Sequence, residues 1–126
     1  MKILGVDFVM LPVSDLERAA RFYRQTLGLR QELLNTTFQW AEFDGGNVTI
    51  ALKGGAVDPH PAVGGRSRVA LAVDDVEEAC AELSRKGVTI VNGPTDYQVC
   101  WSAEIHDPDG NAVLLHHRAD NTYGTA

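Results

Sequence analysis

The sequence is poor in cysteine and in positive charge, and it contains no long apolar run. Its 126 residues include two cysteines, Cys80 and Cys100, which are too few for a disulfide framework. Eleven Lys and Arg residues stand against 17 Asp and Glu residues, and the net charge is −6. Because there is no basic cluster, we expect neither nucleic acid nor an anionic membrane surface as a partner. No segment approaches the ~20 apolar residues that a membrane helix needs.

The first residues also lack the apolar run and the small-residue cleavage site of a secretory signal. We therefore expect a cytoplasmic protein. The composition is otherwise that of a globular chain, with 44% hydrophobic and 22% charged residues. A chain of this length forms one compact domain, or two small modules that share one core. We predict a single domain over residues 1–126.

One turn near the end of the chain organises the rest. Asp107 accepts backbone N–H bonds at the first position of the turn, and Pro108 pre-sets φ at the second. Gly110 has the backbone freedom that the chain needs as it leaves the turn. We therefore expect the flanking stretches 103–106 and 111–116 to form a hairpin. A turn this tight fixes which side chains share a face of the sheet.

The chain contains an internal repeat. Residues 41–52 repeat the Ala-Glu-apolar start, the Gly-Asn turn and the alternating strand of residues 103–116. Residues 9–17 match residues 69–77 at an offset of 60. Two coincidences at nearly the same offset indicate a tandem duplication of a unit of about 60 residues.

Each copy reads as strand, helix and three strands. Ser14 with Glu17 and Asp74 with Glu77 predict capping boxes at two helix starts, and Gly28 and Gly87 predict the helix ends. A helix covers one face of such a sheet, so the other face must be buried elsewhere. The predicted fold is α+β, with tandem βαβββ modules whose curved mixed sheets enclose a cleft. The predicted strands are 3–13, 29–34, 37–44, 47–53, 67–73, 88–91 and the closing hairpin, with a turn at 92–94 and a loop at 95–97. The predicted parts are module 1 (3–53), a linker (54–66), module 2 (67–117) and a polar, frayed tail (118–126).

These residues resemble the glyoxalase, bleomycin resistance protein and extradiol dioxygenase superfamily, also called vicinal oxygen chelate. The matching marks lie in residues 13–17, 22–23 and 27–29, in their counterparts 73–76 and 87–88, and in residues 107–111. The resemblance covers residues 4–117. Together and in this order, the motifs are specific for the fold but not for a reaction.

Many members of that superfamily bind a divalent metal through four side chains, one from each matched strand. By motif, those positions are Phe8, Ala51 (or Ile50 if the turn shifts by one), Arg68 and Leu114. None of these side chains is a metal ligand. We therefore predict no metal and no cofactor.

Strand alternation predicts the side chains that face the cleft. They are mostly apolar or aromatic with a few polar groups, which is typical of a small-molecule site. An alternative is that the aromatic residues are simply core. The cleft-facing set is Phe8, Met10, Phe38, Trp40, Glu42, Thr49, Ala51, Arg68, Ala70, Cys100, Ser102, Glu104, Ala112, Leu114 and His116. The residues predicted to bind ligand are Phe8, Met10, Phe38, Trp40, Arg68, Cys100, Ser102 and Leu114, together with Trp101 at the cleft mouth, where the superfamily resemblance implies a ligand-contacting loop.

Arg68 is the most informative of these residues, because an inward guanidinium requires a carboxylate or an anionic ligand. It either anchors a ligand carboxylate or phenolate, or it pairs with Glu104 or Glu42. Glu104 and His116 form a candidate acid–base pair, although a lone inward His is more often a hydrogen-bonded core residue.

The remaining His and Cys residues carry weaker signals. His60 and His106 are expected in or beside loops, in water. Cys100 is a nucleophile only if a His lies within hydrogen-bonding distance, and no His can be assigned to it from the sequence.

Two function classes remain. The first is a metal-free binding protein of the bleomycin-resistance type, which sequesters an aromatic or anionic ligand. The second is a lyase, isomerase or dioxygenase that uses either a displaced metal site (His116, Glu104 and Glu42) or metal-free acid–base chemistry (Arg68, Glu104 and His116). A structural role with the cleft as a dimer core comes third.

The superfamily resemblance and the commonness of two-fold symmetry predict a homodimer with composite clefts. The sequence leaves open whether one chain closes on itself or on a partner, and it does not name the ligand.

Overall fold

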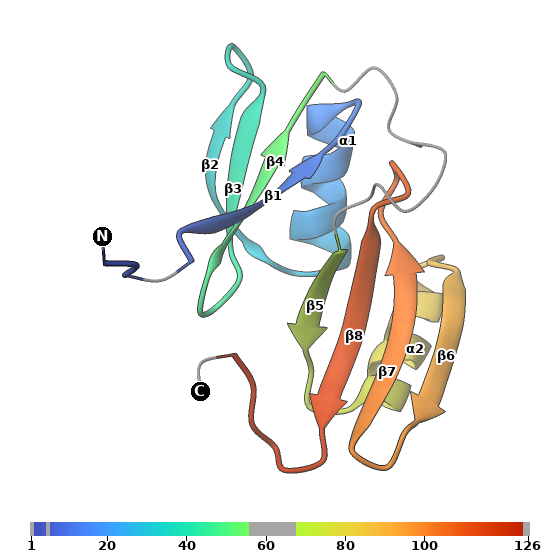
Figure 1. Ribbon diagram of the computed structural model, residues 1–126. Helices are drawn as coiled ribbons and strands as arrows, with labels where there is room; N and C mark the ends of the chain where they lie inside the picture. The colour runs from blue at the N-terminus through green and yellow to red at the C-terminus, as the bar shows by residue number, and fades with distance from the viewer. Residues whose placement is uncertain (1, 5, 56–67, 125–126) are drawn as a thin grey trace. The chain divides into compact units, whose positions relative to one another are not determined.

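The computed structural model describes residues 2–4, 6–55 and 68–124. The chain divides into two compact units, Met1–Pro59 and His60–Ala126, and each is described separately (Figure 1). Of the predicted linker 54–66, only Gly54 and Gly55 fall within the described residues.

Unit 1 contains a four-stranded mixed sheet. Its strands are β1 (Phe8–Pro12), β2 (Arg30–Asn35), β3 (Trp40–Asp44) and β4 (Thr49–Lys53), in the spatial order β1-β4-β3-β2. β1 runs parallel to β4, and the other neighbouring strands are antiparallel. The helical segment between β1 and β2 therefore carries the chain from one edge of the sheet to the other.

That helical segment is α1 (Leu16–Arg21), followed directly by a π-helical turn, η1 (Phe22–Thr26). Its apolar residues recur at spacings of three and four, which places them on one side of the helix. The ring centroids of Tyr23 on the helix and Phe43 on the sheet lie 5.9 Å apart. The buried side chains between helix and sheet are Leu11, Val13, Leu16, Ala19, Ala20, Tyr23, Ala41, Phe43, Ile50 and Leu52.

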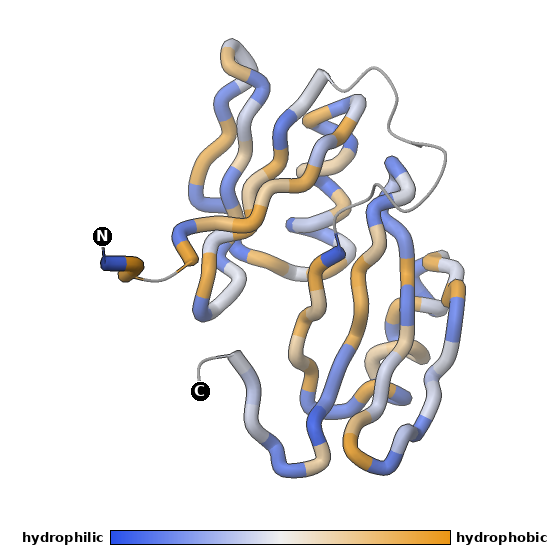
Figure 2. Tube along the Cα trace, in the orientation of Figure 1, coloured by the Kyte–Doolittle hydropathy of each residue, from blue (hydrophilic) through white to orange (hydrophobic). Residues whose placement is uncertain are grey.

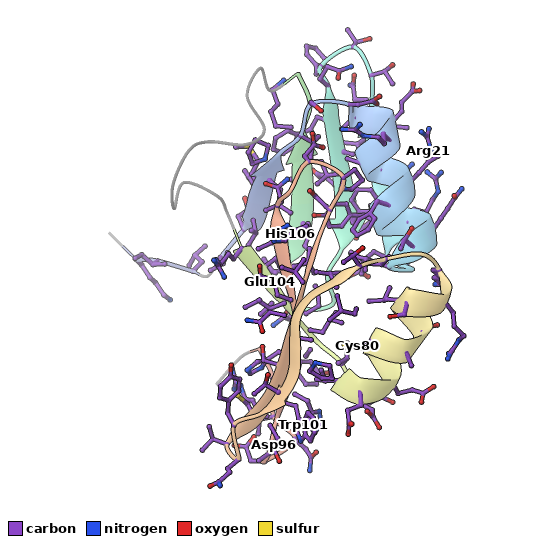
Figure 3. The ribbon with its side chains drawn as sticks, turned by 90° about the vertical axis from the view of Figure 1, so that its right-hand side faces the viewer. Arg21, Cys80, Asp96, Trp101, Glu104 and His106 are labelled. Atoms are coloured by element: carbon purple, nitrogen blue, oxygen red, sulfur yellow. The ribbon has the colours of Figure 1, made fainter. Side chains whose placement is uncertain are left out.

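Unit 2 repeats this arrangement. Its elements are β5 (Arg68–Ala72), α2 (Val76–Arg85), β6 (Ile90–Asp96), β7 (Cys100–His106) and β8 (Ala112–Arg118), with the strand order β5-β8-β7-β6. Figure 3 shows Cys80 on the side of α2 that faces the strands. Val76, Cys80 and Leu83 are buried there with Ala103, Ile105, Val113 and Leu115. The predicted α+β fold and its internal repeat are confirmed.

The helix N-caps lie one residue later than predicted. Asp15 and Asp75 have extended backbones, and their carboxylates accept the backbone N–H of Arg18 and Glu78 at 3.0 and 2.9 Å. In both places two adjacent side chains could cap the helix, and the second one does: Asp15 rather than Ser14, and Asp75 rather than Asp74. The expected capping boxes with Glu17 and Glu77 are therefore wrong.

Several strand boundaries also differ; the strand predicted over residues 37–44, for example, is β3 at Trp40–Asp44, because residues 36–39 form a turn. The first strand, predicted over residues 3–13, is β1 at Phe8–Pro12. β6 continues to Asp96 through the predicted turn 92–94, because register shifts at Asn92 and Thr95 keep it paired with β7. A similar shift interrupts the pairing of β2 with β3. Both irregular strands are edge strands of their sheets.

The predicted hairpin between β7 and β8 is confirmed, and its turn is built around one carboxylate. Asp107 Oδ1 accepts the backbone N–H groups of Asp109 and Asn111 at 2.9 and 2.8 Å, and Oδ2 accepts the Asn111 side-chain amide at 2.8 Å. The Asp107 carbonyl accepts the Gly110 N–H at 2.9 Å. The three polar side chains are buried, with Asn111 at 0% exposure.

The tail was predicted to be frayed, but hydrogen bonds order its described residues. Arg118 belongs to β8, and the Ala119 N–H donates to the Val99 carbonyl at 3.0 Å. The Thr122 hydroxyl and N–H both donate to Asp120 Oδ1, at 2.6 and 2.9 Å. The bond from the Thr122 hydroxyl is the main cause that lowers the pKa of Asp120. Figure 2 shows that this segment is mostly hydrophilic, so local hydrogen bonds rather than apolar burial organise it.

Candidate functional site

The face of the unit 1 sheet opposite α1 carries aromatic and apolar side chains. We call this the open face of unit 1; it holds Phe8, Met10, Trp40, Glu42 and Ala51. Phe8 packs edge-on against Trp40 with ring centroids 5.6 Å apart. The Trp40 indole N–H donates to Glu42 Oε2 at 3.1 Å. Phe8 and Met10 remain 47% and 44% exposed, so this face presents apolar surface beside an oriented carboxylate.

The face of the unit 2 sheet opposite α2 is more polar. This open face of unit 2 holds Arg68, Ala70, Cys100, Ser102, Glu104, His106, Ala112, Leu114 and His116. The alternation of strand side chains and the register of β5, β8 and β7 place these residues on one side. Residues predicted from alternation to share this face therefore do so.

One carboxylate joins two bases on this face. Arg68 donates from NH1 to Glu104 Oε1 at 3.1 Å, and His106 Nε2 lies 2.9 Å from Glu104 Oε2. The Glu104 side chain is 19% exposed, whereas those of Arg68 and His106 are 64% and 42% exposed. Figure 3 shows Glu104 and His106 near the same end of β7. The Arg68–Glu104 pair, one of the two alternatives for Arg68, is thus present.

His106 is the site residue that sequence reasoning missed. As expected, it lies beside a turn and its side chain is 42% exposed, but it is also the last residue of β7 and shares a face with Glu104. The signal was available, since residues two apart in a strand point to the same face.

An Arg guanidinium has five N–H donors, so Arg68 keeps donors for a second acceptor while it bonds Glu104.

His116 takes a different place from the one expected of an acid–base partner. It lies opposite Ser102 on β7, whereas Glu104 lies opposite Leu114. Within the part of the chain that the structure describes, Glu104 bonds Arg68 and His106, and no hydrogen bond joins it to His116. The roles of Glu104 and His116 in catalysis stay a prediction.

The four positions that the superfamily resemblance assigns to a metal do not fit one. Ala51 pairs with Met10, and Leu114 pairs with Ala70, so both point onto the open faces. Neither they nor Phe8 and Arg68 offer a ligand atom. Within residues 2–4, 6–55 and 68–124, no group of three or more His, Cys, Asp or Glu side chains could hold a metal ion. Glu42 belongs to unit 1, whereas Glu104 and His116 belong to unit 2.

Two other predicted ligand-binding residues, Phe38 and Cys100, lie in different environments. Phe38 is 71% exposed in the turn between β2 and β3, where its N–H donates to Asn35 Oδ1 at 2.9 Å. Cys100 is a half-exposed free thiol at the start of β7. Burial raises the pKa of the Cys80 thiol, which lowers its reactivity.

Trp101 does not share the open face with Cys100 and Ser102. It lies opposite His117 across the strands, and it lines a pocket of about 200 Å³ with residues 74–77 at the start of α2. This follows because neighbours in a strand point to opposite faces; the expected role of Trp101 at the cleft mouth stays a prediction.

A larger pocket lies where the tail leaves β8. It has a volume of about 470 Å³ and is formed entirely by unit 2. No sequence signal pointed to it, because it depends on how the tail folds back. Its lining residues are Ala72, Val73, Asp74, His116, His117, Arg118, Asn121, Thr122 and Tyr123.

Among the described residues, no helix is long and apolar enough to cross a membrane.

Comparison with known proteins gives consistent similarities. A family model described as Glyoxalase/Bleomycin resistance protein/Dioxygenase superfamily matches residues 5–115. The structure of TnmS3, described as an antibiotic binding protein from Streptomyces sp. CB03234, is similar with a TM-score of 0.78 and 30% identity, over 94% of this chain and 99% of that one.

Two curated proteins are also similar in sequence to this chain. An uncharacterized protein of Mycolicibacterium smegmatis is 31% identical over 88% of this chain and 91% of its own length. A lactoylglutathione lyase of Escherichia coli O157:H7 is 29% identical over 84% of this chain and 87% of its own length. The similar proteins therefore include both a binding protein and an enzyme.

Proposed function

Because this chain belongs to the glyoxalase/bleomycin resistance protein/dioxygenase superfamily, we propose that it is a metal-free binding protein of the bleomycin-resistance type. It sequesters an aromatic or anionic small molecule without changing it. The observation that carries the proposal is the chemistry of Phe8, Ala51, Arg68 and Leu114, which replaces all four metal-ligand positions with side chains that bind no metal.

The two open faces offer complementary contacts for such a ligand. Phe8, Met10 and Trp40 supply apolar and aromatic surface in unit 1, and aromatic pairs prefer edge-on or offset stacking. Arg68 supplies an exposed guanidinium in unit 2. These side chains would supply the contacts of the proposed cleft, whether it forms within one chain or across a homodimer. The likeness to TnmS3, which is described as an antibiotic binding protein, supports the proposal.

The first experiment follows tryptophan fluorescence while a broad panel of aromatic molecules is added. Trp40 lies on the open face of unit 1 and Trp101 does not, so the Trp101→Phe variant isolates the relevant signal. We expect quenching or a spectral shift of Trp40 with at least one aromatic anion. No response to any member of the panel contradicts the proposal.

The alternative is an enzyme, which the likeness to lactoylglutathione lyase and the Glu104–His106 contact both favour. A carboxylate beside an imidazole can move a proton, whereas sequestration needs no such pair. Elemental analysis of protein purified without chelator tests the metal-dependent form of this enzyme. Stoichiometric Zn, Fe, Mn or Ni would overturn the metal-free proposal and favour the enzyme.

The variant Arg68→Glu is expected to weaken binding of an aromatic anion by more than tenfold. The substitution replaces an attractive charge with a repulsive one and sets two carboxylates beside each other, at residues 68 and 104. The free energy of unfolding should change by only about 1 kcal/mol, since the Arg68 side chain is 64% exposed. Calorimetric titration and urea unfolding measure the two quantities.

The matched control is Arg85→Glu. Arg85 is a similarly exposed arginine that lies 4.0 Å from the carboxylate of Glu78 on α2, on the covered side of the sheet. It should leave ligand affinity unchanged. If both variants bind alike, Arg68 is only a surface residue and its assignment to the cleft is wrong.

We also propose that the protein is a cytoplasmic homodimer with composite clefts. Two exposed apolar side chains on the edge strand β1, Phe8 and Met10, supply surface for such an interface, and two-fold closure is the commonest symmetry. Light scattering at micromolar concentration should give twice the chain mass of 13.7 kDa. A monomer mass contradicts this prediction.

A further inference from the structure

The pocket beside the tail is lined by the tail itself and by the two strands next to it. The tail pocket, as we call the cavity of about 470 Å³ described above, lies between the end of β5, the end of β8 and residues 121–123. Figure 1 shows the tail turning back after β8, on the same side as the end of β5. Its volume falls within the range of ordinary small-molecule sites.

His117 and Asn121 hold the tail in this position. The His117 ring bonds the Val73 carbonyl through Nδ1 at 2.8 Å and Asn121 Oδ1 through Nε2 at 2.9 Å. It therefore ties the end of β5 to the tail. Asn121 has φ of 62°, a left-handed conformation that Asn adopts more readily than most residues. The Asn121 N–H donates to the Arg118 carbonyl at 2.9 Å, which closes the turn.

The chemistry of the walls favours an anion that carries a ring. Arg118 uses NH1 for a weak bond to the Thr122 hydroxyl at 3.3 Å, and its remaining donors suit the planar geometry of a carboxylate. No hydrogen bond joins the His116 ring to any residue that the structure describes. Tyr123 is 66% exposed and lines the pocket, so its ring face is accessible for stacking.

Asp74 adds a second requirement. It lines the same pocket from the end of β5, and its carboxylate repels a second negative charge on the ligand. A hydroxyl or amino group on the ring would instead donate a hydrogen bond to it. The combination of Arg118 and Asp74 thus selects a ligand with one carboxylate and one donor.

We propose that the tail pocket is a further binding site, for a hydroxy- or amino-substituted aromatic carboxylate, which shares His116 with the open face of unit 2. Arg118 and His116 bind the carboxylate, Tyr123 stacks on the ring, and Asp74 accepts from the ring substituent. This site does not depend on the open face of unit 1 or on Arg68. It holds whether or not the protein sequesters a ligand in the proposed cleft.

Trp101 provides a local reporter for the test. It lines the adjoining pocket of about 200 Å³, which shares Asp74 and His117 with the tail pocket. In the Trp40→Phe variant, Trp101 is the remaining tryptophan. The probes are anthranilate, salicylate and 4-hydroxybenzoate at up to millimolar concentration, with 2-aminobenzamide as the uncharged counterpart of anthranilate. We expect at least one acid to change Trp101 fluorescence and to release or absorb heat in calorimetry.

The variants Arg118→Gln and Tyr123→Ala then identify the site. We expect Arg118→Gln to weaken binding of the acid by about tenfold or more, and Tyr123→Ala by several-fold. Arg85→Gln and Tyr97→Ala change the same residue types at exposed positions that do not line the pocket, so they should bind like the parent protein. Melting temperatures confirm that the variants are folded.

The outcomes are separable from those of the proposed function. Binding that Arg68→Glu abolishes and Arg118→Gln leaves intact overturns the tail site and supports the cleft. Equal binding of anthranilate and 2-aminobenzamide overturns the role of Arg118. No response to any of the three acids overturns the proposal altogether.

Discussion

Replacing Asp107 with alanine is expected to lower the free energy of unfolding by roughly 3 kcal/mol or more. The carboxylate of Asp107 accepts the N–H groups of Asp109 and Asn111 and the side-chain amide of Asn111. All three residues are buried, so water cannot replace the lost acceptor. Each buried donor that loses its acceptor costs about 1–3 kcal/mol. Urea unfolding followed by circular dichroism measures the change.

Two variants separate this cause from a general loss of charge. Asp107→Asn keeps one oxygen as an acceptor but sets an amide against the Asn111 amide, so its loss should be intermediate. Asp120→Ala also removes a carboxylate that accepts two hydrogen bonds, both from Thr122, but Asp120 is exposed on the tail. It should change stability little. If Asp107→Ala and Asp120→Ala have equal effects, burial of the turn does not control its stability.

Truncating Phe43 to alanine should be similarly severe, at about 3–5 kcal/mol. Phe43 is completely buried between β3 and the helical segment, against Tyr23. The substitution removes apolar contacts and leaves a cavity that the surrounding strands and helix cannot fill without moving. The midpoint of urea unfolding should fall, with a smaller shift for Phe43→Leu because less volume is lost.

Phe38→Ala is the matched control on the same hairpin. Phe38 is 71% exposed, so the same chemical change should alter stability by no more than about 0.5 kcal/mol. A ligand titration with this variant also tests its predicted role in binding. Comparable destabilisation by the two truncations would contradict the packing described for unit 1.

The fold could be predicted from the sequence because local signals and the repeat agree. The Asp107 turn fixes the register of its hairpin, and the offset of 60 relates Phe8 at the start of β1 to Arg68 at the start of β5. The caps were misplaced by one residue because Ser14 and Asp15, like Asp74 and Asp75, can both cap. Which one does so depends on where the chain leaves the strand.

The sequence predicted which side chains of the candidate site share a face of the sheet, but not which of them form hydrogen bonds with one another. Alternation correctly placed Arg68 and Glu104 together, because a strand has only two faces. Trp101, which the superfamily resemblance placed at the cleft mouth, lies on the other face of its strand. His106 is exposed beside a turn as expected, but its contact with Glu104 was not expected. The tail pocket arises from a hydrogen bond between His117 and Asn121 and from the backbone of the tail, and no periodic pattern in the sequence encodes either of them.

The irregular pairing of β2 and β6 has a consequence for how copies of this chain meet. An edge strand with free N–H and C=O groups is a template for aggregation. β2 and β6 each contain register shifts, and Pro94 in β6 has no N–H to offer. By contrast, β1 and β5, at the other edge of each sheet, pair in continuous register. Strand-to-strand growth is therefore blocked at one edge of each sheet, and this favours closed assemblies over open fibres.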